Sequence, residues 1–146
     1  MDAKEYLYRV KNMDDYINAK IQEAAQLRSR IRSLGAMNYD GLKVKNGSKH
    51  DFTDAVDSLL KLEGEINEQI DRLADFKREA EEMIDMLKDN RYKTVLLRYY
   101  LCNERFDRIA ERTGYSVRQV QRLHGLALID FKRIFEKCHE MSLNVM

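Results

Sequence analysis

The stretch FTDAVDSLLKLEGEINEQIDRLADFKREAEEMIDML, residues 52–87, places an apolar side chain at every third or fourth position. Ten of the eleven positions in this series are apolar, and the exception is Gln69. The series is Phe52, Ala55, Leu59, Leu62, Ile66, Gln69, Leu73, Phe76, Ala80, Met83 and Leu87. Such spacing, sustained over several heptads, is typical of a coiled-coil seam. We therefore expect one long helix here.

A second series of the same kind precedes it, with nine apolar positions out of ten. Its members are Ala3, Tyr6, Val10, Met13, Ile17, Lys20, Ala24, Leu27, Ile31 and Leu34. Between the two series, residues 35–51 contain three glycines and no apolar periodicity, which predicts a loop. Residues 1–88 are therefore expected to form an antiparallel coiled-coil hairpin. Asp51 or Thr53 is the expected N-cap of its second helix.

The two polar seam residues fall in adjacent layers of this hairpin. Folding the chain about residue 43 sets Ile17 beside Gln69 and Lys20 beside Ile66. Polar groups buried at a seam can select one register or one partner number. Alternatively, the Lys20 ammonium extends along the seam into solvent. The spacing leaves both interpretations open.

Composition excludes several classes of protein. The 146 residues include no proline, which favours uninterrupted helices and an all-α fold. No apolar run approaches the roughly 18 residues of a membrane span, and the first residues do not resemble a secretory signal. The cysteines Cys102 and Cys138 lack the paired spacing of a zinc site. A reducing, cytoplasmic location without membrane contact is expected.

Charge is unevenly distributed along the chain. Residues 1–88 carry 15 basic and 18 acidic side chains, whereas residues 89–137 carry 11 basic and 6 acidic ones. The overall net charge of +1 therefore conceals a basic C-terminal third. This asymmetry indicates a polyanionic partner for that third.

Residues 89–138 contain the signals of three helices. Asn90 is the expected cap of the first, and a second spans residues 106–112. Thr113, Gly114 and Tyr115 then predict a tight turn, and Ser116 with Gln119 forms a capping box that opens the third. Residues 139–146 are expected to be a flexible tail.

The spacing around this turn is that of a helix-turn-helix. Ala110 allows the two helices to cross closely, and Gly114 accepts a left-handed backbone in the turn. Val120 and Leu123 are expected to be buried under the crossing. A DNA-reading helix would then expose the first residues after the turn.

Arginine and glutamine on that helix suit the hydrogen-bonding pattern of the major groove. The expected base-reading residues are Val117, Arg118, Gln121 and Arg122. The expected contacts with the DNA backbone are Ser116, Arg108, Arg112, Lys132 and Arg133. The alternative is a three-helix bundle whose polar face is only solvated.

Several segments of this region carry a family resemblance. They are residues 96–100 (LLRYY), 107–116 (DRIAERTGYS), 120–123 (VQRL) and 127–128 (AL). Together they resemble region 4 of the sigma-70 family, which implies reading of a promoter −35 element and docking on RNA polymerase. With the preceding coil, the chain also resembles small phage and prophage proteins of Gram-positive bacteria. The resemblance implies a host RNA polymerase as a partner.

The chain departs from the sigma pattern at two places. Val117 and Arg118 stand where the family commonly has an Arg-Glu pair, and Leu126 replaces a basic residue. A target other than the standard −35 element is therefore expected. No counterpart of sigma region 2 fits the coiled segment, so the resemblance implies an accessory factor or activator.

No motif for catalysis is apparent. The histidines His50, His124 and His139 lack metal-site spacing, and no phosphate-binding glycine loop or nucleophile elbow occurs. We expect no enzyme activity, no cofactor and no metal. Double-stranded DNA is the expected ligand of a transcription regulator.

Two other functions fit the same pattern. A helix-turn-helix beside an oligomerising helix also occurs in DNA-packaging proteins of phages, and the coil could instead be a protein-binding adaptor. A basic cluster near the predicted loop, which includes Arg28, Arg30 and Arg32, could add a nucleic-acid contact or be solvated. The hairpin could act alone or as a homodimer that forms a four-helix bundle.

Overall fold

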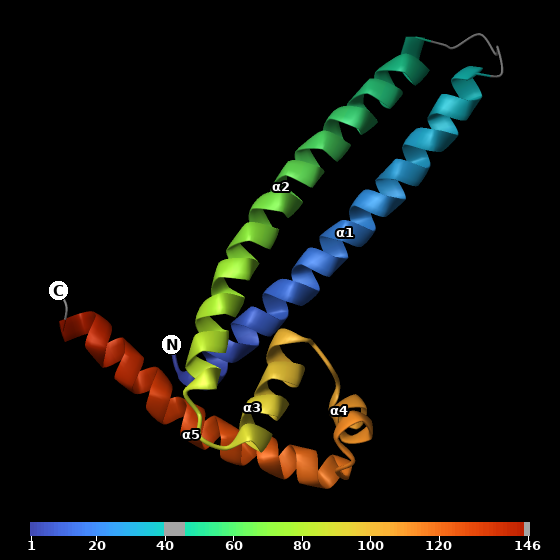
Figure 1. The fold of residues 1–146 in the computed structure, drawn as a ribbon. Helices are drawn as coiled ribbons and strands as arrows, with labels where there is room; N and C mark the ends of the chain where they lie inside the picture. Colours follow the sequence, from blue (N-terminus) through green and yellow to red (C-terminus); the bar gives the residue numbers. More distant parts are fainter. Residues whose placement is uncertain (40–45, 145–146) are drawn as a thin grey trace. The chain divides into compact units, whose positions relative to one another are not determined.

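The computed structural model describes the backbone of residues 1–39 and 46–144 and the side chains of residues 1–36 and 50–141. This part of the chain is mainly helical and contains no strand, which confirms the all-α prediction. Its elements follow one another as shown in Figure 1. They are α1 (Ala3–Tyr39), α2 (Asn46–Asp85), α3 (Asn90–Leu96), the π-helical segment η1 (Leu97–Leu101), α4 (Phe106–Thr113) and α5 (Val117–Asn144).

The loop predicted over residues 35–51 is too long. Helix α1 continues to Tyr39 and α2 begins at Asn46, so both ends of the predicted loop are helical. Gly35 is tolerated inside α1 because a helical glycine costs only about 1 kcal/mol relative to alanine. The predicted N-caps Asp51 and Thr53 are wrong, since both residues lie inside α2. The rest of the predicted loop, residues 40–45, lies outside the described residues.

Two further boundary predictions need correction. The N-cap of α3 is Asp89 and not Asn90, because the Asp89 carboxylate accepts a hydrogen bond from the Arg91 amide at 2.9 Å. The flexible tail predicted at residues 139–146 is helical up to Asn144, and residues 139–144 contain neither glycine nor proline to interrupt α5. Residues 145–146 of that tail lie outside the described residues.

The chain forms two compact units. Residues 15–72 form the hairpin unit, and residues 1–14 together with 73–146 form the composite unit. The domain boundary predicted at residue 88 stays a prediction. Among the described helices, none has the length and apolarity that crossing a membrane requires.

In the hairpin unit, α1 and α2 pack along the predicted seam. Ala24, Leu62 and Ile66 form one buried cluster, with Leu59 half-buried against it. The Lys20 ammonium lies 3.1 Å from the Glu65 carboxylate, one residue from its predicted neighbour Ile66. This hydrogen bond raises the pKa of Lys20. The lysine is therefore held at the seam by an ion pair.

In the composite unit, the first turns of α1 pack on residues that follow α2. The Tyr6 and Phe135 rings lie 5.3 Å apart, and Tyr8 meets Tyr100 edge to face at 5.4 Å. The side chains of Leu7 and Ile84, which are not seam positions, are also fully buried. The N-terminal segment thus contributes to the core that supports α3, α4 and α5.

Candidate nucleic-acid interface

The turn between α4 and α5 is fixed by its backbone and by a helix cap. Gly114 adopts a left-handed conformation with φ of 78°, and its amide donates to the Ala110 carbonyl at 2.9 Å. The Gln119 amide donates to the Ser116 hydroxyl at 3.1 Å, and the Ser116 amide donates to the Gln119 side chain at 3.0 Å. The backbone N–H groups of Ser116 and Gln119 have no partner within the helix, and each is satisfied by the side chain of the other residue. This is the predicted capping box.

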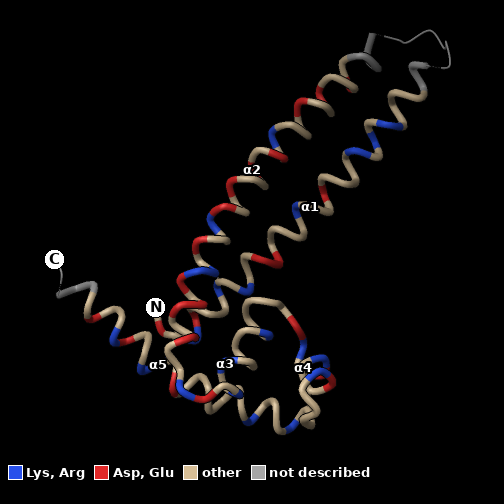
Figure 2. The backbone as a smooth tube through the Cα atoms, viewed as in Figure 1, with Lys and Arg blue, Asp and Glu red and all other residues tan. Residues whose placement is uncertain are grey.

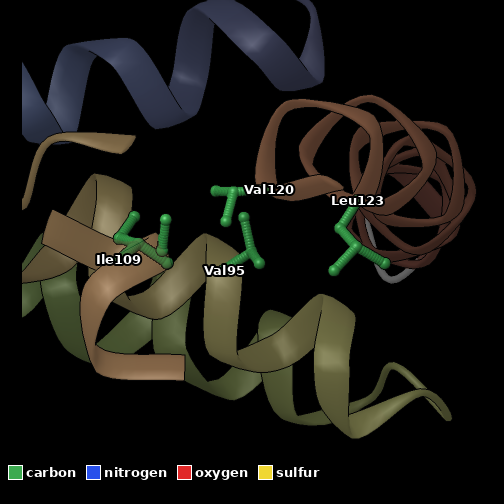
Figure 3. Close-up of a cluster of buried hydrophobic side chains, with 5 residues drawn as sticks. Val95, Ile109, Val120 and Leu123 are labelled. Atoms are coloured by element: carbon green, nitrogen blue, oxygen red, sulfur yellow. The ribbon is translucent and has the colours of Figure 1, made fainter. Parts of the chain in front are cut away.

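A small apolar core lies beneath this turn. Val95, Ile109 and Val120 are 1% exposed or less, and Ala110 and Leu123 are 7% and 8% exposed. Figure 3 shows Val95, Ile109 and Val120 directed toward one another from three helices. Partly buried aromatic rings close the cluster: Tyr92, Tyr99, Phe106 and Tyr115. The crossing of α4 and α5 is therefore rigidly packed.

The four predicted base-reading residues lie together on the first turns of α5. Arg118, Gln121 and Arg122 are exposed, and Val117 is 42% exposed. At about 100° per residue, Arg118, Gln121 and Arg122 span an arc of about 100° on one side of the helix. The structure thus groups these side chains on a single solvent-facing surface.

The predicted backbone contacts divide into two groups. Arg108 and Arg112 lie one turn apart on α4, where Arg108 is 3.7 Å from Glu111 and Arg112 is 3.4 Å from Glu104. Lys132 and Arg133 begin 14 residues after Arg118, which is about 20 Å along the helix. That distance exceeds the roughly 12 Å width of the major groove. The structure does not bring this second pair to the turn.

A cleft of about 270 Å³ beside Arg122 contains residues that sequence analysis missed. Arg91 and Tyr92 of α3 line it together with Tyr115, Gln119, Leu123 and Leu126. Two hydrogen bonds, of 2.9 and 3.2 Å, fix the Arg91 guanidinium to the Asp89 carboxylate. The local signal in the sequence is Asp89, two residues before Arg91, and the prediction of Asn90 as the helix cap misses it.

His124 secures the buried side of α5. Its Nε2 and the Tyr100 hydroxyl lie 2.6 Å apart, and the imidazole packs among the rings of Tyr99, Tyr100 and Phe106. Burial and, to a smaller extent, the charge of Lys4 lower the pKa of His124 to about 4. The imidazole is therefore neutral at pH 7, as its apolar surroundings require.

Residues of α1 hold the segment between η1 and α4. The Lys11 ammonium donates to the Tyr99 carbonyl and to the Asn103 side chain, and it lies 4.4 Å from the centre of the Tyr99 ring. The Asn103 amide in turn donates to Asp14 at 3.0 Å. Asn103 has φ of 58°, a conformation that asparagine adopts more readily than most residues. This network positions the start of α4.

The predicted basic cluster near the hairpin loop is described only in part. Arg28 is paired with Glu63 at 2.8 Å, while Arg30 and Arg32 are exposed. Two lysines of the same predicted cluster, Lys43 and Lys45, lie outside the described residues.

Within the described part of the chain, no group of three or more potential metal ligands lies close together. Comparisons with protein-family models, with curated proteins and with solved structures each find no match to this chain. Function is therefore inferred from the residues and their geometry.

Proposed function

We propose that this chain binds double-stranded DNA in a sequence-specific manner and regulates transcription. One observation carries the proposal: the left-handed turn at Gly114 and the capped start of α5 present Arg118, Gln121 and Arg122 to solvent. Their helix rests on the buried side chains of Val120 and Leu123, so it is a rigid element of the kind that enters a major groove.

The exposed residues offer the chemistry that base reading needs. A guanidinium can donate two hydrogen bonds to guanine O6 and N7, as Arg118 and Arg122 would. The Gln121 amide can pair with adenine N6 and N7, and Val117 can contact a thymine methyl group.

Phosphate contacts would surround this surface. Ser116, Arg108 and Arg112 flank the turn, and Arg91 lines the same cleft as Arg122. Lys132 and Arg133 would contact phosphates outside the groove. The excess of basic side chains in residues 89–137 favours such binding, because phosphate neutralisation supplies much of the affinity for DNA.

The regulatory role follows from the sigma region 4 resemblance. An accessory factor or activator, encoded by a phage and acting in the cytoplasm with host RNA polymerase, agrees with the motif and with the coiled segment of residues 1–88, which fits no counterpart of region 2. Bound sequences located near promoters would support this role over DNA packaging.

The proposal is tested by selecting bound fragments from a random DNA pool at about 150 mM salt, because salt sets the strength of phosphate contacts. The wild type should enrich a defined motif, and the Arg118→Ala/Arg122→Ala variant should not. The matched control, Arg72→Ala/Arg78→Ala, removes the same charge from exposed positions of α2. Loss of the motif in the control, or no enrichment by the wild type, would contradict the proposal.

The single variant Arg122→Ala separates base reading from phosphate binding. It should cost about 1–3 kcal/mol on the selected site and relax the preference at one base pair. An equal loss on every sequence would reassign Arg122 to the DNA backbone.

A further inference from the structure

The hairpin unit leaves much of its seam open to water. Among its described hydrophobic side chains, the buried ones are Ile17, Ala24, Ala55, Leu62 and Ile66. Five other seam residues are only half-buried: Leu27, Ile31, Leu34, Phe52 and Leu59. Two helices cover a seam from two sides only, whereas four helices enclose a core completely. The unit therefore has apolar surface that further helices could bury.

Additional apolar side chains lie on one flank of this unit. Leu60, Glu63, Asn67 and Ile70 follow one another in steps of three or four residues, so they share one face of α2. Leu60 is 62% exposed and Ile70 is 42% exposed. A partner on this flank would remove the apolar surface of both side chains from water.

Helix α1 contributes to the same flank. Ile21, Ala24 and Arg28 line a cleft of about 250 Å³ together with Glu63, Ile66 and Asn67 of α2. Ile21 is 42% exposed. Because Lys20 pairs with Glu65, Ile21 lies at the level between Leu60 and Ile70. Residues Ile21, Leu60 and Ile70, with the cleft between them, are named here the Ile21 face.

The two helices of the unit have opposite charge. Residues 15–36 carry four basic and two acidic side chains, whereas residues 50–72 carry two basic and seven acidic ones. Figure 2 shows basic positions along this part of α1 and mainly acidic ones along α2. A second hairpin related by a two-fold axis parallel to the helices would place each α1 opposite an α2. Each net-basic α1 segment would then adjoin a net-acidic α2 segment of the other copy, so the net charges of the helices are complementary across the interface.

We propose that the Ile21 face binds a second copy of this chain and forms a four-helix bundle. In this arrangement the Ile21 side chain of one copy inserts between Leu60 and Ile70 of the other, at the same level along the hairpin. The interface is self-complementary, as a two-fold dimer requires. The dimer would form whether or not α5 binds DNA.

Sedimentation equilibrium of the full chain tests the dimer. The wild type should reach twice its chain mass of 17.3 kDa at micromolar concentrations. The variant Ile21→Glu/Leu60→Glu places acidic groups on the interface and should raise the dissociation constant at least about tenfold. Because both side chains are partly exposed, circular dichroism should show unchanged helix content.

Tyr16→Glu is the matched control, since Tyr16 is 54% exposed and lies beside Lys20, on the flank that carries Glu65. This variant should remain dimeric. A monomeric wild type, a larger ring, or a dimer disrupted by Tyr16→Glu but not by Ile21→Glu/Leu60→Glu would overturn the proposal.

Discussion

The composite unit and the hairpin unit both pack helices on apolar side chains, but they enclose them to different extents. The largest fully buried side chains of the described residues, which include Tyr100, Phe131 and Leu7, all belong to the composite unit. In the hairpin unit, half of the seam stays in contact with water. A regular heptad pattern therefore predicts where a helix packs, while the number of helices around it determines how deeply its side chains are buried.

The largest expected loss of stability comes from a substitution in the core of the composite unit. Phe131 is 0% exposed and packs near Phe135, with ring centres 6.3 Å apart. Phe131→Ala should lower the free energy of unfolding by about 4 kcal/mol, because it removes a buried ring and leaves a cavity. Denaturant unfolding followed by circular dichroism measures this loss. A cost under about 1 kcal/mol would mean that this core is loosely packed.

The next prediction concerns the pH dependence of the same core. The pKa of His124 is about 4 in the folded chain and about 6.5 in an unfolded one. The unfolded chain therefore binds the proton more readily, so the stability is fully present above pH 6.5 and declines as the pH falls toward 4. The loss should reach up to about 3 kcal/mol.

Urea unfolding at several pH values between 4 and 7 measures this effect. His124→Gln is the control, because glutamine can keep a hydrogen bond to Tyr100 and does not titrate. The decline in stability should be smaller for this variant than for the wild type. Identical pH profiles would exclude His124 as the source.

The matching core substitution in the hairpin unit is at Leu62. This residue is 8% exposed and lies in the buried cluster with Ala24 and Ile66. Leu62→Ala should cost about 2 kcal/mol, at the lower end of the range for buried leucine, because an open seam can close around the missing atoms. The midpoint of denaturant unfolding checks this value. A cost as large as that of Phe131→Ala would remove the difference between the two units.

Sequence periodicity predicted the seam well, since all the predicted positions of both series are buried or half-buried. It failed at the helix ends near residues 35–51, because single glycines interrupt a helix less than the prediction assumed. The capping box at Ser116 and the left-handed Gly114 were predictable because both depend on neighbouring residues only.

The contacts that hold the candidate interface in place could not be predicted from such local patterns. Lys11 and Asn103 are 92 positions apart, and their contact depends on how α1 meets the segment after η1. The cleft around Arg91 likewise requires α3 and α5 to be placed in space. Local patterns thus identified the exposed residues of α5, while the contacts that hold them needed the tertiary structure.

The next smaller loss of stability is expected at Gly114 of the composite unit. Gly114 has φ of 78°, and a Cβ atom added there would meet no atom within 4 Å. Gly114→Ala should therefore cost about 1–2 kcal/mol through backbone strain alone. Thermal unfolding measures the loss. An unchanged midpoint would mean that the turn can adopt another conformation.

The smallest effect has the opposite sign and belongs to the hairpin unit. Gly64 lies inside α2, is exposed, and offers open space to an added Cβ atom. Gly64→Ala should stabilise α2 by about 0.5–1 kcal/mol, because alanine loses less backbone entropy in a helix than glycine does. Hydrogen exchange of the backbone amides of residues 60–68 measures this stabilisation, and it should be slower in the variant. Gly64 is two residues from Leu62, so it lies away from the seam, and it is one turn after Leu60, next to the Ile21 face. Faster exchange would show that another surface packs there, and the contrast between an enclosed core and an open seam would then need revision at this position.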